Sequence, residues 1–369
     1  MKHLFLLFLP FFFFSCEVSD TISTEIPEIP VHTFTFDEEF PITVLPTDED
    51  LKQSSSIYYE NVNNIIDATP SGETIHVNLF KFSTGTIRDR LLEAMRRGVE
   101  VHVMLDIDVV NNYTTKLLQD SVTTFLRYNN YLSSKSINHN KYLLSSGIAT
   151  SDSIRRNIVL QTSYNFTSSD NPKYQDMVML ADEGLYNAFV ANYDDMVVAH
   201  TEKKLREWTF EWEEYGEATV GFLPKITGGD IAVDIFAGVS SSAVVTIMNS
   251  KWEDDRPTLK STLKALLDQG TNLNIMAPPS RTDNLDVSWE KTLNEWAANY
   301  ENCTVKWISA RSIHNKTILI EDGENSAVWT GAHNFRSRSL RYNNEVILKL
   351  EHASIIAEYK VWLETILQQ

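Results

Sequence analysis

The sequence carries one tripeptide twice, as His139-Asn140-Lys141 and as His314-Asn315-Lys316, and apolar residues follow each copy. Side chains two residues apart in a strand project on the same face, so each copy would present an imidazole beside an ammonium group. A neutral imidazole can attack phosphorus, and a protonated one can donate to a leaving alcohol; histidine titrates close enough to neutrality for both roles. The two copies together therefore predict cleavage of a phosphodiester.

The residues downstream of each tripeptide repeat as well. Asn165 and Asn334 each follow a second predicted strand, and an acid lies eleven residues later, at Asp176 and at Glu345. Asparagine amides and lysines can hold the nonbridging oxygens of a phosphate, and a carboxylate can fix the tautomer of an imidazole. The expected catalytic set is His139, Lys141, Asn165, Asp176, His314, Lys316, Asn334 and Glu345.

Two further polar residues lie beside the asparagines. Ser163 precedes Asn165 by two positions and His333 immediately precedes Asn334, so both are candidates for contacts with substrate. Neither His333 nor His200 nor His352 has cysteines or carboxylates at the spacing of known metal ligands. We therefore expect neither a metal nor a cofactor.

Matching strand, helix and strand patterns precede the two tripeptides. The first pattern covers residues 75–79, 86–97 and 99–105, and Thr86 with Asp89 predicts a capping box at the start of its helix. The second covers residues 244–248 and 257–269, with a further strand from residue 273. Glycine at positions 98 and 270 would end the two helices. Two such units predict a duplicated fold with parallel strands.

The junction between the two copies falls near residues 205–220. Leu205, Trp208, Trp212 and Tyr215 are spaced as on one face of a helix. We expect this helix to pack across the two halves, since such stripes usually face a core. A membrane-touching aromatic stripe is the alternative, although its several glutamates suit an anionic lipid surface poorly. The expected organisation is a signal peptide at 1–16, a tether at 17–50, a first half at 51–210 and a second half at 211–369.

The N-terminus has the pattern of a bacterial lipoprotein signal. Lys2 is followed by an apolar run over residues 4–14 that is too short to span a bilayer, and Ser15-Cys16 ends it. Cys16 is the expected lipidation site, which predicts an exported protein anchored at the bacterial cell envelope, on the periplasmic or outer-membrane surface. An ordinary secretory peptide with an incidental Cys16 is the alternative. No later stretch is long and apolar enough to cross a membrane.

The charge of the chain argues against one class of partner. The formal net charge is −18, from 50 acidic and 32 basic side chains. Proteins that bind nucleic acid neutralise many phosphates with lysine and arginine, so nucleic acid is a disfavoured partner, although a local basic cleft remains compatible with this charge. The expected partners are a phospholipid or another phosphodiester and the membrane, and we expect a monomer.

With these motifs the chain resembles the phospholipase D superfamily. The family signature is His-x-Lys, four residues and Asp, then Gly-Ser-x-Asn and a later Asn-x-Glu, once in each half. Asn343-Asn344-Glu345 matches the last element, and Tyr174-Gln175-Asp176 fills that place in the first half. The signature Asp is replaced by Ser146 and Glu321, and the Gly-Ser pair by Thr162-Ser163 and Gly331-Ala332.

The resemblance implies an α/β fold with two homologous α/β/α sandwich halves, approximate two-fold symmetry and a shared cleft. It further implies His139 as nucleophile, His314 as general acid and base, and hydrolysis or transfer of phosphatidyl groups through a phosphohistidine intermediate. An exported nuclease of the same superfamily and a catalytically inactive binding protein are the alternatives. A cardiolipin synthase role is less expected, because such relatives usually carry transmembrane helices.

Overall fold

The computed structural model describes residues 34–52, 57–109, 112–134, 136–203, 209–279 and 284–369. All statements below concern these residues, which belong to one compact unit, Thr33–Gln369. The predicted signal peptide, the lipidation site Cys16 and the first part of the predicted tether lie outside them. None of the described helices is both long enough and apolar enough to span a membrane.

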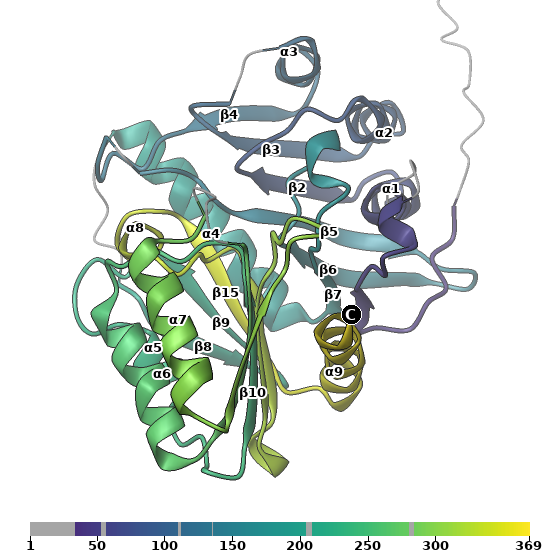
Figure 1. Ribbon diagram of the computed structural model, residues 1–369. Coiled ribbons are helices and arrows are strands. Elements are labelled where there is room, and N and C mark those ends of the chain that lie inside the picture. The colour runs from purple at the N-terminus through teal and green to yellow at the C-terminus, as the bar shows by residue number, and fades with distance from the viewer. Residues whose placement is uncertain (1–33, 53–56, 110–111, 135, 204–208, 280–283) are drawn as a thin grey trace, which may run out of the picture. The chain divides into compact units, whose positions relative to one another are not determined.

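The first half is built on a sheet of seven described strands in the order β1-β7-β6-β5-β2-β3-β4 (Figure 1). The strands are β1 (Ile42–Val44), β2 (Thr74–Leu79), β3 (Glu100–Asp106), β4 (Thr124–Tyr128), β5 (Lys141–Ala149), β6 (Ile154–Thr162) and β7 (Met177–Ala181). The helices of this half are α1 (Ile57–Ala68), α2 (Gly85–Arg96), α3 (Tyr113–Gln119) and α4 (Glu183–Glu202).

The second half is built on a sheet of eight described strands in the order β12-β11-β10-β13-β14-β15-β9-β8. The strands are β8 (Trp212–Tyr215), β9 (Ala218–Leu223), β10 (Val244–Asn249), β11 (Asn272–Ala277), β12 (Cys303–Trp307), β13 (Lys316–Glu321), β14 (Ala327–Gly331) and β15 (Glu345–Leu350). The helices are α5 (Ala232–Ile235), α6 (Pro257–Gln269), α7 (Val287–Asn299), α8 (Ser337–Arg341) and α9 (Ala353–Gln368).

The two sheets repeat one topology, which confirms the predicted duplication. Six strands of the first sheet, in the order β4-β3-β2-β5-β6-β7, correspond one by one to six strands of the second, in the order β12-β11-β10-β13-β14-β15. In both halves the strands around the first helix are parallel, β2 with β3 and β10 with β11, as the strand–helix–strand pattern predicted. Gly98 and Gly270 follow α2 and α6 with φ of 93° and 103°, a conformation that favours glycine.

Helices cover both faces of the first sheet. α1 contacts β5 and α2 contacts β3, while on the other face Tyr193 and Met196 of α4 contact His76 and Asn78 of β2. In the second sheet α6 and α7 share a core with Val245, Ile247 and Ile318. The opposite face of that sheet joins α9 and the first half in one continuous core. The predicted fold class, two α/β sandwich halves, is therefore confirmed (Figure 1).

Two local predictions are wrong. Thr86 does not cap α2, because the helix begins at Gly85 and Thr84 is its N-cap residue. Both Ser83 and Thr84 donate their backbone N–H to the carbonyl of Phe166, and this loop contact sets the start of the helix. The predicted junction helix is a strand over Trp212–Tyr215, paired with β9, in which Trp212 lies opposite Gly221 and packs on Trp329. Residues 204–208 of that junction lie outside the described part.

The end of the predicted tether is part of the first sheet. Residues Ile42–Val44 form β1, which pairs antiparallel with β7 in the register Ile42 to Met179. Phe36 and Val44 are buried in the core. The segment from residue 34 to 50 therefore belongs structurally to the first half.

Candidate active site

Each His-x-Lys segment is held by the opposite half of the molecule. The N–H of His139 donates to the carbonyl of Asn344 at 2.9 Å, and the N–H of His314 donates to the carbonyl of Tyr174 at 2.8 Å. Both histidines precede their strands, β5 and β13, rather than lying within them. The two contacts are equivalent in the duplicated fold. These backbone hydrogen bonds between the halves bring together the two His-x-Lys segments, which lie 175 residues apart in sequence.

Both histidines line one cavity of about 390 Å³. His139 is 5% exposed and His314 is partly exposed, so both rings can be reached from solvent. The cavity is lined by Phe80, Ile137, His139, Lys173, Ser250, Lys251, Asn284, Ser312, Ile313, His314, Asn334, Arg336 and Arg338. The structure thus brings the two predicted imidazoles together in a shared site.

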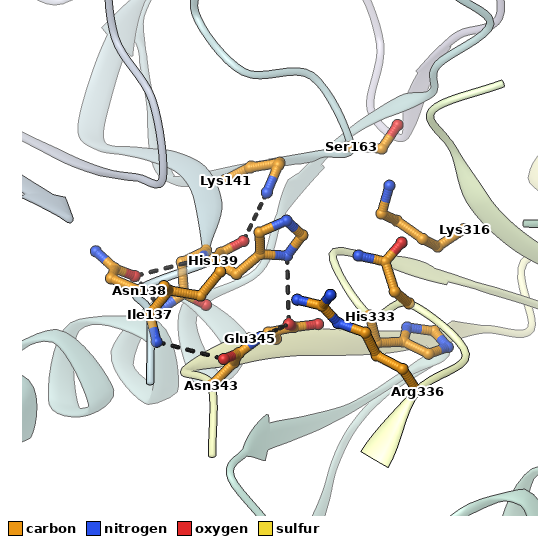
Figure 2. A network of polar contacts seen from close by, with 12 residues as sticks. Ile137, Asn138, His139, Lys141, Ser163, Lys316, His333, Arg336, Asn343 and Glu345 are labelled. Carbon is orange, nitrogen blue, oxygen red and sulfur yellow. Dashed lines mark hydrogen bonds and ion pairs between the residues drawn. The ribbon is translucent and has the colours of Figure 1, made fainter. Parts of the chain in front are cut away.

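The two lysines of the motif lie buried beneath this cavity. Lys141 donates to the carbonyl of His139 at 2.7 Å, and its ammonium lies 5.5 Å from the centre of the Phe80 ring. Lys316 donates to the hydroxyl of Ser250 at 2.8 Å and to the carbonyl of His314. Figure 2 shows Lys141 and Lys316 coming from the two halves toward the region of the His139 ring. They place one amine on each side of the pseudo-symmetric site, and neither is part of the cavity wall.

His139 has a carboxylate partner from the other half. Its Nδ1 lies 3.3 Å from Oε1 of Glu345, within ion-pair distance but without the alignment of a hydrogen bond (Figure 2). The same Glu345 oxygen accepts from the amide of Asn343 at 2.7 Å, and Oε2 has no hydrogen-bond partner. Apo sites often hold such contacts loosely, and they tighten when substrate binds.

The partner of His314 is Gln175, which corrects the prediction for Asp176. Nδ1 of His314 lies 2.7 Å from the amide oxygen of Gln175 and 3.0 Å from the carbonyl of Ser163. Both oxygens are acceptors, so Nδ1 carries the proton and donates. The backbone bridges Asn138 to Asn344 and Ile313 to Tyr174 make Gln175 the equivalent of Glu345.

Asp176 points away from the histidines and joins the two halves. Its carboxylate accepts from Ser163, Thr317, Thr330 and Tyr359, at 2.6, 2.9, 2.6 and 3.0 Å. Successive side chains of an extended segment alternate in direction, so Asp176 faces opposite to Gln175. Its role in the described structure is to hold strands together.

The remaining predicted residues divide between the cavity wall and its surroundings. Asn334 lines the cavity, and its side-chain amide oxygen, Oδ1, accepts from the hydroxyl of Ser250 at 2.9 Å. The amide of Asn165 donates instead to Asp170 at 2.7 Å, and Asn165 is not part of the cavity wall. Ser163 acts through its backbone carbonyl, and His333 is 1% exposed and does not line the cavity. Neither Ser163 nor His333 therefore lines the cavity, as the predicted contacts with substrate would require.

The empty site disfavours positive charge. Burial and the nearby ammonium groups of Lys141 and Lys316 lower the pKa of His139 well below its usual range, and burial with Lys316 does the same to the pKa of His314. Burial lowers the pKa of Lys316 to about 7 and that of Lys141 well below its usual value. Burial also raises the pKa of Glu345. An anion in the cavity would reverse these shifts for the cationic groups.

Several residues of the site were not found by sequence reasoning. Gln175 lies one position before the predicted acid, and Ser250 directly follows β10. Arg336 and Arg338 follow Asn334 by two and four residues, a spacing that could have marked them once Asn334 was placed at the site. Figure 2 shows the Arg336 side chain reaching toward Glu345.

The described residues contain no cluster of three or more histidine, cysteine, aspartate or glutamate side chains that could hold a metal ion. The positive groups described at the cavity are histidine, lysine and arginine side chains. The chemistry that these groups can perform is nucleophilic attack, proton transfer and stabilisation of anionic oxygens.

Solved structures share this fold at low sequence identity. Phosphatidylserine synthase from Haemophilus influenzae Rd KW20 superposes with a TM-score of 0.62 at 13% identity, covering 88% of this chain and 87% of that one. Polyphosphate kinase from Porphyromonas gingivalis gives 0.59 at 13% identity, covering 89% of this chain and 50% of that one. A mutant of the yeast tyrosyl-DNA phosphodiesterase gives 0.51 at 11% identity, covering 84% and 88%.

No curated protein sequence matches the chain. A family model does, and its description is "Cardiolipin synthase, PLD-like domain". It matches residues 63–206 and 240–367, one stretch in each half and together most of the chain. The paired His-x-Lys segments lie within these two stretches. The chain therefore belongs to the phospholipase D superfamily, in the family of the cardiolipin synthase phospholipase D-like domain.

Proposed function

We propose that this protein is a phosphodiesterase that cleaves phosphatidyl-type diesters through a phosphohistidine intermediate, with His139 as nucleophile and His314 as general acid and then base. The observation that carries the proposal is the single cavity lined by both histidines, each held on the opposite half. One lone imidazole cannot both attack phosphorus and protonate the leaving group, whereas two facing one phosphate can.

The first step forms a bond between Nε2 of His139 and phosphorus and breaks the bond to the leaving oxygen. Positive charge develops on the His139 ring, and the carboxylate of Glu345 lies 3.3 Å from its Nδ1 to stabilise it. The protonated form of His314 donates its proton to the leaving oxygen. The negative charge of the bound diester raises the pKa of His314 and so favours this protonated form.

The second step releases the phosphoryl group. Neutral His314 takes a proton from water, the water oxygen attacks phosphorus, and the bond to His139 breaks. The products are a phosphomonoester and an alcohol, and an alcohol in place of water would give a new diester. Lys141, Lys316 and the amide of Asn334 would hold the nonbridging oxygens as charge builds up.

The unequal partners of the histidines support this division of roles. A carboxylate stabilises the cation that forms on a nucleophilic imidazole, and Glu345 provides one to His139. A neutral amide leaves the imidazolium of His314 more acidic, which suits proton donation, and Gln175 provides that amide. The roles remain exchangeable in principle because the site is nearly symmetric.

A second hollow supports an apolar substituent on the substrate. A cavity of about 500 Å³ shares Phe80 and Ile137 with the active-site cavity, and Phe82 and Val109 add to its apolar surface. The rest of its lining is polar: Lys81, Ser83, Asp108, Asn112, Thr167 and Ser169. A diester bound at the histidines would have apolar surface available beside it. This favours a lipid substrate over a nucleic acid, as does the net charge of −18.

We also propose that the protein is exported and held at the cell envelope through a lipidated Cys16. The basis is the N-terminal pattern of Lys2, the apolar run and Ser15-Cys16. Several acyl chains on Cys16 would anchor the protein stably. Replacement of Cys16 by serine should move the protein from the membrane to the soluble fraction, and retention in the membrane would contradict lipidation.

The catalytic proposal is tested with the single variants H139A and H314A. Each should lower the rate on bis(p-nitrophenyl) phosphate by about a thousandfold or more, whereas H102Q, on β3 outside the cavity, should retain full activity. Quenching turnover of a slow labelled substrate should leave acid-labile label on the peptide with His139. Label on His314 would reverse the roles, and full activity in either alanine variant would refute the shared site.

The substrate class is tested separately. Purified protein is assayed on phospholipid vesicles of different head groups and on single-stranded and double-stranded DNA. Release of a head-group alcohol supports the proposed function. Release of acid-soluble nucleotides instead supports the nuclease, and turnover of neither lipid, DNA nor artificial diester supports the inactive binding protein.

A further inference from the structure

The active-site cavity carries more positive charge than one phosphodiester requires. Four cationic side chains line its wall, Lys173, Lys251, Arg336 and Arg338, and no carboxylate does. This is unexpected in a chain with a net charge of −18. By the proposed function, Lys141 and Lys316 already serve the single negative charge of the scissile diester.

The carboxylates behind the wall balance part of this charge. Lys173 pairs with Asp170, while Lys251 and Arg336 share Glu253 at 3.1 and 3.2 Å. Arg338 has no carboxylate within ion-pair distance among the described residues, and its buried Nε and that of Arg336 have no hydrogen-bond partner. Asp170 and Glu253 thus pair with three of the four cations, and Glu345 lies near the wall beside His139. Among the four, Arg338 is the one without an ion-pair partner in the described part of the chain.

The two guanidinium groups of the cavity wall lie on one side of the pseudo-symmetric site, that of the second half. The N–H of Thr167 donates to the carbonyl of Asn165 at 2.6 Å, and the N–H of Arg336 donates to the carbonyl of Asn334 at 2.9 Å. These equivalent contacts make Thr167 the counterpart of Arg336 and Ser169 the counterpart of Arg338. The first half therefore presents two hydroxyls where the second half presents two guanidinium groups.

Guanidinium groups with free N–H donors bind phosphate oxygens in a fixed, often bidentate geometry. Buried donors without partners are costly unless a ligand satisfies them. A diester with one charge would leave Arg338 without an anionic partner and Arg336 with Glu253 alone. A second phosphate on the same substrate molecule, next to the scissile one on the side of the second half, would satisfy them.

We infer that the phosphatidyl-type substrate of this site carries a second phosphate directly beside the scissile phosphate, bound by Arg336 and Arg338. The inference rests on the proposed function and narrows its substrate class. A nucleic acid is less favoured as the source of the second phosphate, because its strand would continue past the site. The four cations belong to one cavity of about 390 Å³, a size suited to a small molecule.

The test measures the binding of inorganic phosphate, inorganic pyrophosphate and thymidine 3′,5′-bisphosphate. Binding is followed by calorimetry and, in parallel, by inhibition of bis(p-nitrophenyl) phosphate hydrolysis. Pyrophosphate should bind at least tenfold more tightly than phosphate. This advantage should fall by roughly ten- to hundredfold in R336Q and in R338Q, because each removes charged hydrogen bonds to the second phosphate.

The matched control is R341Q on the same helix, α8. Arg341 donates to the carbonyls of Lys225 and Gly228 and does not line the cavity, so the advantage of pyrophosphate should be unchanged. The conservative variant R338K should keep part of the advantage, which separates charge recognition from a folding defect. Equal binding of phosphate and pyrophosphate by the unmodified protein would overturn the inference.

The remaining outcomes also decide between explanations. Tighter binding of thymidine 3′,5′-bisphosphate than of pyrophosphate, lost in R338Q, would overturn the inference in favour of phosphates separated by a sugar, as in nucleic acid. Hydrolysis of bis(p-nitrophenyl) phosphate that needs both histidines, together with pyrophosphate binding that is unchanged in R336Q and R338Q, would overturn the inference while the proposed function stands. Calorimetry reports on the arginines even if no diester is turned over, so the two proposals can fail separately.

Discussion

Nδ1 of His314 lies 2.7 Å from the amide oxygen of Gln175, at the place where Nδ1 of His139 meets the carboxylate of Glu345. The two positions are equivalent in the duplicated fold, so the difference in side chain breaks the symmetry of the site. A carboxylate favours the charged form of an imidazole, and an amide does so much less. The two histidines are therefore chemically distinct before any substrate binds.

Replacing Gln175 by glutamate should make the two histidines alike. A carboxylate near Nδ1 would raise the pKa of His314. If His314 acts as the acid, the alkaline limb of the profile of kcat/KM against pH should move to higher pH. Q175A should lower kcat without moving that limb, and an unshifted limb in Q175E would show that His314 is not the acid.

Replacing Glu345 by glutamine should slow the formation of the phosphoenzyme. The variant keeps the size and the contact with Asn343 but removes the negative charge that stabilises a cation on His139. We expect kcat to fall by about a hundred- to a thousandfold. The burst of labelled intermediate should disappear in rapid-quench measurements, because its formation becomes rate-limiting. A variant that forms the intermediate at the normal rate would place Glu345 outside the first step.

The sequence predicted the strands, the duplication and the meeting of the two His-x-Lys segments, because a repeated pattern of local elements implies a repeated topology. The prediction of Asp176 as the partner of His314 was wrong because it assumed the same spacing after the asparagine in both halves. Eleven residues separate Asn334 from Glu345, but ten separate Asn165 from the structurally equivalent Gln175. The connection contains a short 3-10 turn at Ser168–Asp170 in one half and the helix α8 in the other, and their lengths differ.

The cationic wall could not be predicted from local pattern. Lys173, Lys251 and Arg338 lie in three separate connections, and their common location depends on contacts across the halves such as Tyr174 with Ser312. The segment of strand β8 was predicted as a helix because Trp212 and Tyr215 are three residues apart, a spacing typical of one helix face. Pairing with β9 and the packing of Trp212 on Trp329 determine the extended conformation of this segment. Both are tertiary contacts.

The binding of a simple anion should depend on pH through Lys316. Burial lowers the pKa of this lysine to about 7 in the empty site, so it is charged below that pH and neutral above it. Sulfate keeps its charge over this range, so its dissociation constant, measured by calorimetry, should increase as the pH rises through 7, by up to about tenfold per unit for one proton. The pH dependence should disappear in K316M and persist in K291M, a surface variant on α7. Sulfate binding that strengthens with rising pH would contradict this assignment of charge.

Replacing Asp176 by asparagine should destabilise the protein rather than disable its chemistry. The buried carboxylate accepts hydrogen bonds from Ser163 in the first half and from Thr317, Thr330 and Tyr359 in the second. An amide offers one acceptor oxygen and sets its NH₂ group against hydroxyl donors, so we expect a loss of about 2–4 kcal/mol in the free energy of unfolding, measured in urea. D194N, at an exposed position of α4, should change it by less than about 0.5 kcal/mol.

Catalysis by the folded fraction of D176N should stay within about threefold of the unmodified enzyme, since changes that spare transition-state contacts leave kcat little altered. Ser163 contacts His314 through its backbone carbonyl, and that contact does not need the carboxylate of Asp176. Activity should therefore be referred to the concentration of folded sites, measured by the burst of labelled intermediate. A hundredfold loss of kcat with an unchanged unfolding midpoint would place Asp176 in the chemistry after all, and would contradict the assignment of Gln175 as the partner of His314.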